Sequence, residues 1–235
     1  MATSGLRPKV LVNFAASIDG KINPAPGLLA GPFTMSRESE DGRRMKELRG
    51  RGDAVVVGAS NVRADDPALS LSDSERRRRR EAGIAEPWRV VVTSRGEGVR
   101  PDMKIFDPTL GAGAVVAHTA RMPAATRDAL GRVARLVELG TETIAIGDLL
   151  DWLQASLGVR TVVCEGGGDL CARFFSAQAV DELYLTVVPR ILGGARAPTL
   201  AAGAGFGPDE IRDARLGAVE RIGDELFLRY DFSWS

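Results

Sequence analysis

Short apolar runs alternate with amphipathic segments along most of this chain. Continuous apolar runs rich in β-branched residues predict buried strands at 10–15, 54–57, 89–92, 114–117 and 161–164. Alternating apolar and polar positions predict two more strands, at 182–188 and 225–230. Apolar positions at helical spacing predict helices over 36–49, 146–157 and 170–177.

The order of these elements predicts an α/β fold. Strands that alternate with helices form a mostly parallel central sheet flanked by helices on both faces. We expect the strand at 225–230 to be a C-terminal antiparallel addition to that sheet. The sequence has no internal repeat and no linker rich in Pro, Gly or Ser, so we expect residues 1–235 to form a single domain.

Charge and composition exclude several classes of protein. Lys and Arg total 31 and so do Asp and Glu, so no overall positive field favours binding to nucleic acid or to an anionic membrane. No apolar run approaches the length of a membrane span, and the first thirty residues lack the pattern of a signal peptide. Cys164 and Cys171 have no second cysteine pair and no nearby histidine, so we expect buried thiols, no metal site and a cytoplasmic location.

The strongest candidate site follows the strand at 161–164. Glu165 ends that strand, and Gly166, Gly167 and Gly168 precede Asp169 and a predicted helix. Exposed backbone N–H groups at a helix N-terminus suit a phosphate, and parallel sheets bind ligands at the carboxyl ends of their strands. The alternative is a strand-to-helix turn that binds nothing. The spacing of the glycines differs from the G-x-G-x-x-G fingerprint of an ordinary Rossmann domain.

Further polar residues follow other predicted strands. Two hydroxyls and a guanidinium that suit a phosphate come directly after the strand at 89–92: Thr93, Ser94 and Arg95. The adjacent carboxylates Asp65 and Asp66 are, with Glu165, candidate catalytic acids, although they could simply end a helix. The five consecutive arginines at 76–80 favour a solvated turn or short helix over a phosphate site.

Several segments occur together in an order that is specific. They are Ser17-Ile18-Asp19-Gly20-Lys21, Leu48-Arg49, the run from Asp53 to Gly58, Ala64-Asp65-Asp66-Pro67, the run from Glu165 to Gly168, and Leu192-Gly193-Gly194. In this set the chain resembles the pyrimidine reductases of riboflavin biosynthesis, which are the reductase domain of a bifunctional deaminase–reductase and its stand-alone relatives. The resemblance runs from about Val10 to the C-terminus and implies a dihydrofolate-reductase-like fold. The zinc-deaminase signature is absent, so no deaminase domain is expected.

The resemblance also implies a reaction and a set of contacts. NADPH would reduce a ribosylaminopyrimidine 5′-phosphate to the ribitylaminopyrimidine 5′-phosphate. The family pattern implies cofactor contacts at the glycine turn and at Ala16, Asn61, Asp65 and Ser94, with Asn61 standing where threonine is usual. It implies substrate contacts at Arg49, Leu69, Glu165 and, more weakly, Ser36. Thr93, Arg95 and Asp169 are added from their chemistry.

Two further implications concern the assembly and the substrate. The family is typically homodimeric, and we expect the strand at 182–188 to lie near an apolar sheet edge that a second copy covers. Many relatives carry an arginine shortly after Asp-Asp-Pro, whereas this chain has Leu-Ser-Leu-Ser at 69–72. That difference leaves open another NADPH-dependent reductase of this fold, acting on a pterin-like or other carbonyl or imine compound. A non-catalytic nucleotide-binding protein is the third reading, against which the glycine turn and Glu165 argue.

Overall fold

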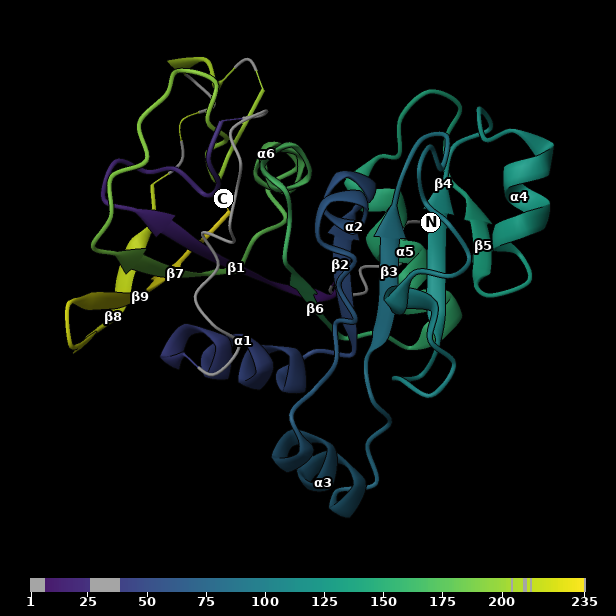
Figure 1. Ribbon diagram of the computed structural model, residues 1–235, viewed down its shortest axis with the longest axis horizontal. Coiled ribbons are helices and arrows are strands. Elements are labelled where there is room, and N and C mark those ends of the chain that lie inside the picture. Colours follow the sequence, from purple (N-terminus) through teal and green to yellow (C-terminus); the bar gives the residue numbers. More distant parts are fainter. Residues whose placement is uncertain (1–6, 26–38, 204, 209–210, 212, 235) are drawn as a thin grey trace.

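The computed structural model describes residues 7–25, 39–203, 205–208, 211 and 213–234. The strands of this part of the chain form one nine-stranded sheet in the order β5-β4-β3-β2-β6-β1-β7-β9-β8 (Figure 1). The strands are β1 (Lys9–Ser17), β2 (Ala54–Gly58), β3 (Trp88–Val92), β4 (Ala114–His118), β5 (Arg135–Glu138), β6 (Thr161–Cys164), β7 (Glu182–Val188), β8 (Arg215–Ile222) and β9 (Glu225–Asp231). The helices are α1 (Glu40–Arg51), α2 (Ala59–Asp65), α3 (Asp73–Glu81), η1 (Lys104–Phe106), α4 (Ala124–Leu130), α5 (Ile146–Leu157) and α6 (Gly168–Ser176).

The pairing of the strands confirms the predicted architecture. All neighbours from β5 across to β7 pair in parallel, whereas β9 pairs antiparallel with β7 and with β8. One expectation was wrong: β7 lies between β1 and β9, so the strand at 182–188 is not near the edge. The edge is formed by β8, which was not predicted. Every residue of β8 is exposed, so its sequence lacks the alternation that marks a half-buried strand.

The core is divided between the two faces of the sheet. Alternate residues of β1 point to opposite faces, so Val10 and Val12 join one buried cluster with α5 and α6, while Leu11 joins a second cluster with Leu48 of α1. The inner strands β2, β3 and β4 are buried along nearly their whole length. This burial on both faces explains why they appear in the sequence as continuous apolar runs.

Hydrogen bonds cap the start of α1 and hold the arginine-rich segment at 76–80 against the end of the same helix. The hydroxyl of Ser39 caps α1 by accepting a hydrogen bond from the Gly42 N–H at 3.1 Å, and the predicted start at Ser36 lies outside the described residues. The arginines at 76–80 belong to the short helix α3. Arg78 and Arg79 donate to the Gly50 carbonyl at 3.0 and 2.8 Å, which ties α3 to the end of α1. This run therefore has a structural role.

No helix in the described part of the chain is long and apolar enough to cross a membrane.

Candidate functional site

The carboxyl ends of three neighbouring strands meet at one edge of the sheet. The strands β6, β2 and β3 are adjacent, and they are followed by Glu165, by α2 and by Thr93. Backbone bonds join two of these ends, because the Glu165 N–H donates to the Val56 carbonyl at 3.0 Å and the Gly58 N–H donates to the Gly166 carbonyl at 2.9 Å. The topology thus brings together segments that the sequence presents separately.

The three glycines between β6 and α6 are needed for the chain to pack against itself. Gly166 has a φ of +71°, and a Cβ placed there would lie 2.1 Å from Cζ of Phe14. A Cβ on Gly167 would lie 2.8 Å from Oδ1 of Asn61, and one on Gly168 would lie 2.4 Å from the Thr199 carbonyl oxygen. Gly167 begins α6 without a side-chain cap. The first N–H groups of α6 have no intrahelical acceptor and suit an anion.

A cavity of about 220 Å³ opens beside this turn. Its polar lining comes from α2, from the end of β3 and from α6: Ser60, Arg63, Thr93, Ser94, Asp169 and Arg173. Thr93, Ser94 and Asp169 were predicted from the sequence, and the other three were not. A usable signal existed for two of them, because Ser60 and Arg63 lie one turn apart in the helix that directly follows β2.

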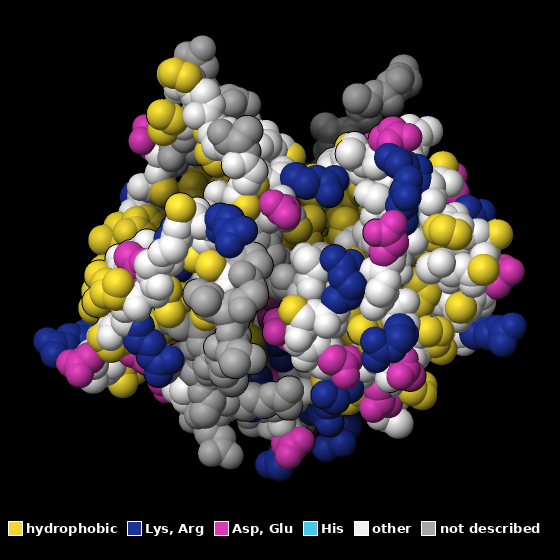
Figure 2. Space-filling model, turned by 45° about the horizontal axis from the view of Figure 1, so that its top comes forward, with side chains coloured by type: hydrophobic (Ala, Val, Ile, Leu, Met, Phe, Trp, Pro, Cys, Tyr) yellow, Lys and Arg dark blue, Asp and Glu magenta, His cyan; other side chains and the backbone are white. Residues whose placement is uncertain are grey.

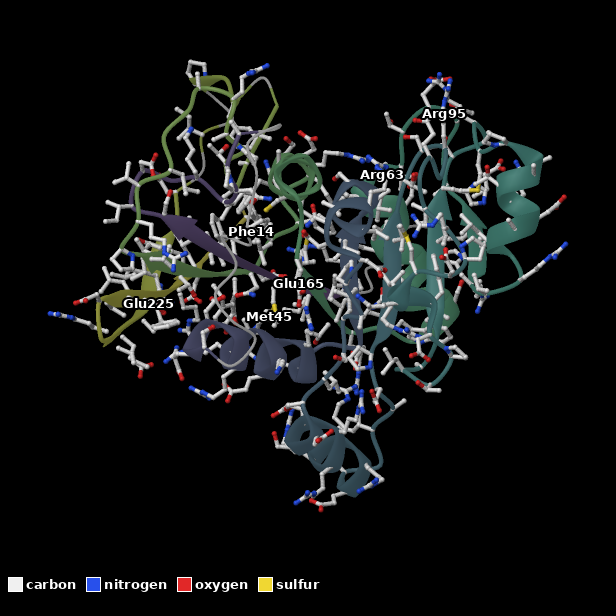
Figure 3. The ribbon with its side chains drawn as sticks, in the orientation of Figure 1. Phe14, Met45, Arg63, Arg95, Glu165 and Glu225 are labelled. Carbon is white, nitrogen blue, oxygen red and sulfur yellow. The ribbon has the colours of Figure 1, made fainter. Side chains whose placement is uncertain are left out.

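The residues after β3 lie at different depths. Thr93 is buried and its hydroxyl accepts from the Gly96 N–H at 2.9 Å, so it shapes the loop. Ser94 is exposed and lines the cavity. Arg95 pairs with Glu97 at 3.6 Å and is not among the residues that line the cavity. Figure 3 shows Arg63 close to the strand ends and Arg95 farther out, at the edge of the molecule.

The residues of α2 have distinct surroundings. Asn61 donates from Nδ2 to the Glu165 carbonyl at 3.3 Å and so holds the end of β6. Asp65 is exposed in the last turn of α2, and partial desolvation raises its pKa. Asp66 ends the helix with a φ of 41°. Its carboxylate accepts from the Lys104 N–H at 2.9 Å and pairs with Nζ of the same lysine at 3.4 Å. Asp66 therefore binds the first residue of η1.

Arg49 and Glu165 form a buried ion pair. Nε and Nη2 of Arg49 donate to the two carboxylate oxygens of Glu165 at 2.6 and 2.7 Å, and the side chains are only 8% and 10% exposed. Arg49 also donates from Nη1 to the Ser70 carbonyl at 3.0 Å and lies 3.4 Å from Sδ of Met45. Most of its donors are thus used inside the protein. The pair fixes the orientation of Glu165 at the glycine turn.

Two other predicted contact residues are buried near this pair. Leu69 has a φ of +50°, which is uncommon for a residue with a Cβ, and it precedes the carbonyl that Arg49 binds. Ala16 is 5% exposed near the carboxyl end of β1, where it pairs with Val187 of β7. Ser36 lies outside the described residues.

Sequence reasoning also missed Asp41. It lies in the first turn of α1, two turns from Arg49. Desolvation and the nearby charge of Glu165 raise its pKa, while a hydrogen bond from the Thr186 hydroxyl and the charge of Arg44 oppose that shift. An acidic residue in the first turn of a helix is ordinary. Nothing in the local pattern distinguishes Asp41 from other acidic residues at helix starts.

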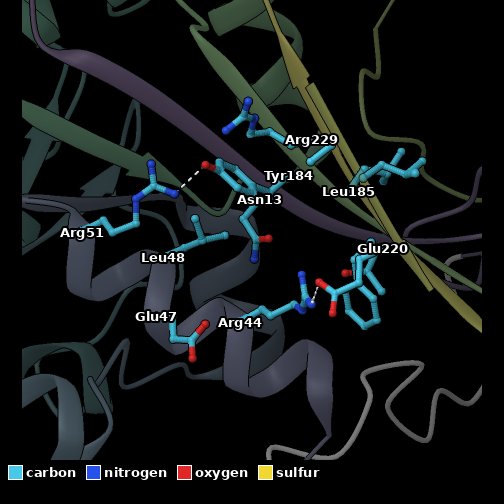
Figure 4. A pocket seen from close by; sticks show the side chains of 13 residues that line it. Asn13, Arg44, Glu47, Leu48, Arg51, Tyr184, Leu185, Glu220 and Arg229 are labelled. Atoms are coloured by element: carbon cyan, nitrogen blue, oxygen red, sulfur yellow. Dashed lines mark hydrogen bonds and ion pairs between the residues drawn. The ribbon is translucent and has the colours of Figure 1, made fainter. Parts of the chain in front are cut away.

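A second cavity, of about 250 Å³, lies between α1 and the strands β1, β7, β8 and β9 (Figure 4). It contains several charged side chains, but these are paired within the protein. Arg44 binds Glu220, and Arg51 binds the Tyr184 hydroxyl. Arg229 binds Asp231, and Glu47 binds Arg43. This cavity is distinct from the strand ends that carry the predicted site.

Among the described residues, no group of three or more His, Cys, Asp or Glu side chains could hold a metal ion. Both cysteines are buried and unbridged, and burial raises the pKa of Cys164 to about 12. Acidic and basic side chains are interspersed over the face drawn in Figure 2.

Comparisons with known proteins show which proteins this chain is similar to. The family model described as the RibD C-terminal domain matches residues 8–228. A protein of Archaeoglobus fulgidus named 2,5-diamino-6-ribosylamino-4(3H)-pyrimidinone 5′-phosphate reductase is 35% identical over 230 residues, which cover 97% of this chain and 100% of that protein.

Solved structures share the fold. A pyrimidine reductase-like protein from Corynebacterium diphtheriae superposes with a TM-score of 0.79 at 20% identity, covering 97% of this chain and 93% of that one. RibD of Acinetobacter baumannii superposes with a TM-score of 0.76 at 23% identity, covering 97% of this chain. The match spans 58% of that RibD chain.

Proposed function

This chain belongs to the RibD C-terminal domain family, and we propose that it reduces 2,5-diamino-6-ribosylamino-4(3H)-pyrimidinone 5′-phosphate to the corresponding ribitylamino compound with NADPH. The relatives establish the broader statement that it is an oxidoreductase of riboflavin biosynthesis. The family is consistent with a nicotinamide cofactor. The choice of the still-aminated pyrimidine follows the names of the relatives at 31–35% identity.

The cavity beside the glycine turn has a polar lining that suits the phosphorylated part of a dinucleotide. The N-terminus of α6 supplies N–H groups for a pyrophosphate, and its glycines bring the backbone close to that position. Ser60 and Ser94 add exposed hydroxyls, and Asn61 fixes the end of β6. We propose that these residues hold NADPH, together with Ala16 and Asp65, for which the family pattern implies cofactor contacts. When bound, the cofactor would supply the hydride.

The single observation that carries the substrate assignment is the ion pair between Arg49 and Glu165. An ionised carboxylate has about four lone-pair positions, and Arg49 occupies one on each oxygen. The others remain for the amino and ring N–H groups of a pyrimidine. Arg49 would thus orient Glu165, which differs from the direct substrate contact that the family pattern implies for Arg49. Leu69 would support the Ser70 carbonyl that positions Arg49.

The reaction needs a proton as well as a hydride. The sugar ring must open before its first carbon can accept hydride, and the exocyclic nitrogen must end protonated. Of the three candidate acids, Glu165 is held by Arg49 and Asp66 by Lys104. Asp65 has no ion pair among the described residues, and partial desolvation raises its pKa. We therefore propose Asp65 as the acid.

The test is a measurement of NADPH oxidation with purified enzyme and three compounds: the aminated pyrimidine, its deaminated counterpart and a dihydropterin. We expect turnover with the aminated compound. Assayed well below its unfolding transition, Glu165→Gln should reduce kcat/KM by roughly 10- to 100-fold through loss of charged recognition. Preferred reduction of the deaminated compound would correct the substrate. Activity only with the dihydropterin would refute the proposed function.

We also propose a symmetric homodimer assembled through β8. This edge strand is exposed along its length and carries Leu216 at 51% and Val219 at 56% exposure. Such an edge is expected to be covered in an assembly. Light scattering should give about twice the chain mass of 25.0 kDa, and Val219→Lys should halve it. Ile84→Lys, at another exposed apolar position, is the control. A monomeric wild type would contradict the proposal.

Two expectations about the whole chain remain proposals. The single nine-stranded sheet of the described residues supports one reductase domain. The two buried, unbridged cysteines are compatible with a reducing compartment, and we propose the cytoplasm.

A further inference from the structure

We propose that Arg63 binds the 2′-phosphate of NADPH and sets the preference of this enzyme for NADPH over NADH. This inference rests on the proposed function, because it assigns a role toward the cofactor named there. Arg63 replaces Arg95, the arginine that the sequence favoured for the same phosphate.

The order of the strands places Arg63 at the end of the cavity where the 2′-phosphate of the cofactor would lie. The glycine turn follows β6, and Ser94 follows β3, which lies two strands away across β2. At the usual spacing of strands, this separation is roughly 10 Å. A dinucleotide with its pyrophosphate at α6 therefore extends its adenosine ribose toward the end of β3. Arg63 and Ser94 both line the cavity there.

Contacts with the loop after β3 hold the guanidinium of Arg63 in place. Its Nη1 donates to the Glu97 carbonyl at 2.8 Å. Its side chain lies close against Gly98, where an added Cβ would be 2.4 Å from the Arg63 Cδ. The loop thus restricts the Arg63 side chain before a ligand binds, so less side-chain entropy is lost on binding.

The donors of Arg63 remain largely available. One of its five N–H groups bonds to the Glu97 carbonyl, and no carboxylate in the described part of the chain forms an ion pair with it. The other two candidate arginines differ. Arg95 is paired with Glu97. Arg173 donates to the Ile144 carbonyl, and desolvation lowers its pKa.

A guanidinium beside exposed hydroxyls suits a phosphate monoester. The planar fork of arginine binds two phosphate oxygens at once, and the hydroxyls of Ser60 and Ser94 are exposed in the same cavity. The 2′-hydroxyl of NADH offers no charge to this arginine. Arg63 therefore favours NADPH over NADH, because only NADPH carries the 2′-phosphate that this arginine would contact.

The test uses calorimetric binding of 2′,5′-ADP and 5′-AMP, two probes that differ by the 2′-phosphate and need no turnover. We expect wild type to prefer 2′,5′-ADP, and Arg63→Ala to weaken its binding by roughly 10- to 100-fold, the loss expected for a charge-assisted contact. Binding of 5′-AMP should change less than about twofold. Arg63→Lys should recover part of the preference, because it restores the charge without the fork.

Arg95→Ala is the matched control, since it removes an exposed arginine from the same loop region. It should leave both affinities unchanged. Equal weakening of both probes by Arg63→Ala, or the selective loss appearing in Arg95→Ala instead, would overturn the proposal. Thermal melts of each variant exclude unfolding as the cause. Selective binding of 2′,5′-ADP without reduction of any pyrimidine would refute the proposed function while leaving this assignment intact.

Discussion

Replacing Glu165 by Gln should destabilise the protein before any substrate is added. The glutamate accepts two hydrogen bonds from Arg49, and both side chains are about nine-tenths buried. Glutamine keeps one acceptor oxygen but turns an NH₂ group toward the second guanidinium donor. Arg49 is then left buried with its charge uncompensated.

The expected loss of stability follows from this geometry. Removing one partner of a buried ion pair costs about 3–5 kcal/mol, and the remaining amide oxygen recovers part of that. We therefore expect about 2–4 kcal/mol, which corresponds to a fall in Tm of roughly 5–15 °C for a domain of this size. Neutralising Arg49 as well should recover part of the loss, because the uncompensated charge is removed.

The assay is thermal or urea unfolding of Glu165→Gln, Arg49→Gln and the double variant, all without ligand. Glu220→Gln is the matched control, since it changes the same side chain in an ion pair with Arg44 in which the glutamate is 56% exposed. That control should cost no more than about 1 kcal/mol. Equal stabilities of Glu165→Gln and wild type, or strictly additive losses in the double variant, would refute the buried pair. A dimeric protein must be compared at one fixed concentration.

Two further predictions concern the glycine turn and Asp41. Gly166→Ala should lower Tm and weaken cofactor binding, because a Cβ there meets Phe14 at 2.1 Å. Gly20→Ala, at a similar φ of +76° with no atom within 4 Å, isolates the backbone strain and should cost much less in Tm. Asp41 has a raised pKa, so its ionisation opposes folding: the stability of wild type relative to Asp41→Asn should be highest in acid and should fall as pH rises above the ordinary value of 3.8. Urea unfolding of both proteins between acid and neutral pH measures this difference, and a constant difference would contradict the burial of Asp41.

Much of the framework was determined by local sequence. The buried strand β6 has a continuous apolar run and the half-buried strand β7 has an alternating pattern, and both begin and end where these patterns predict. The amphipathic helix α5 does the same. The glycine turn was equally visible, because a carboxylate and three glycines between a strand and a helix are uncommon and have few uses. Sequence alone also carried the resemblance that the family match confirmed.

The tertiary structure decided which side chains meet. Arg49 and Glu165 are 116 positions apart, and their pairing depends on α1 crossing the sheet beside β6, which no local pattern encodes. The sequence favoured Arg95, which directly follows a predicted strand, whereas the structure shows Arg63 packed against Gly98 in the cavity lining and Arg95 paired with Glu97. The exposed edge strand β8 had no burial pattern to reveal it. The hydrophobic pattern of a segment indicates how deeply that segment is buried. The partner of each polar side chain is determined instead by the order of the strands and the placement of the helices, because these bring distant segments together only when the whole sheet assembles.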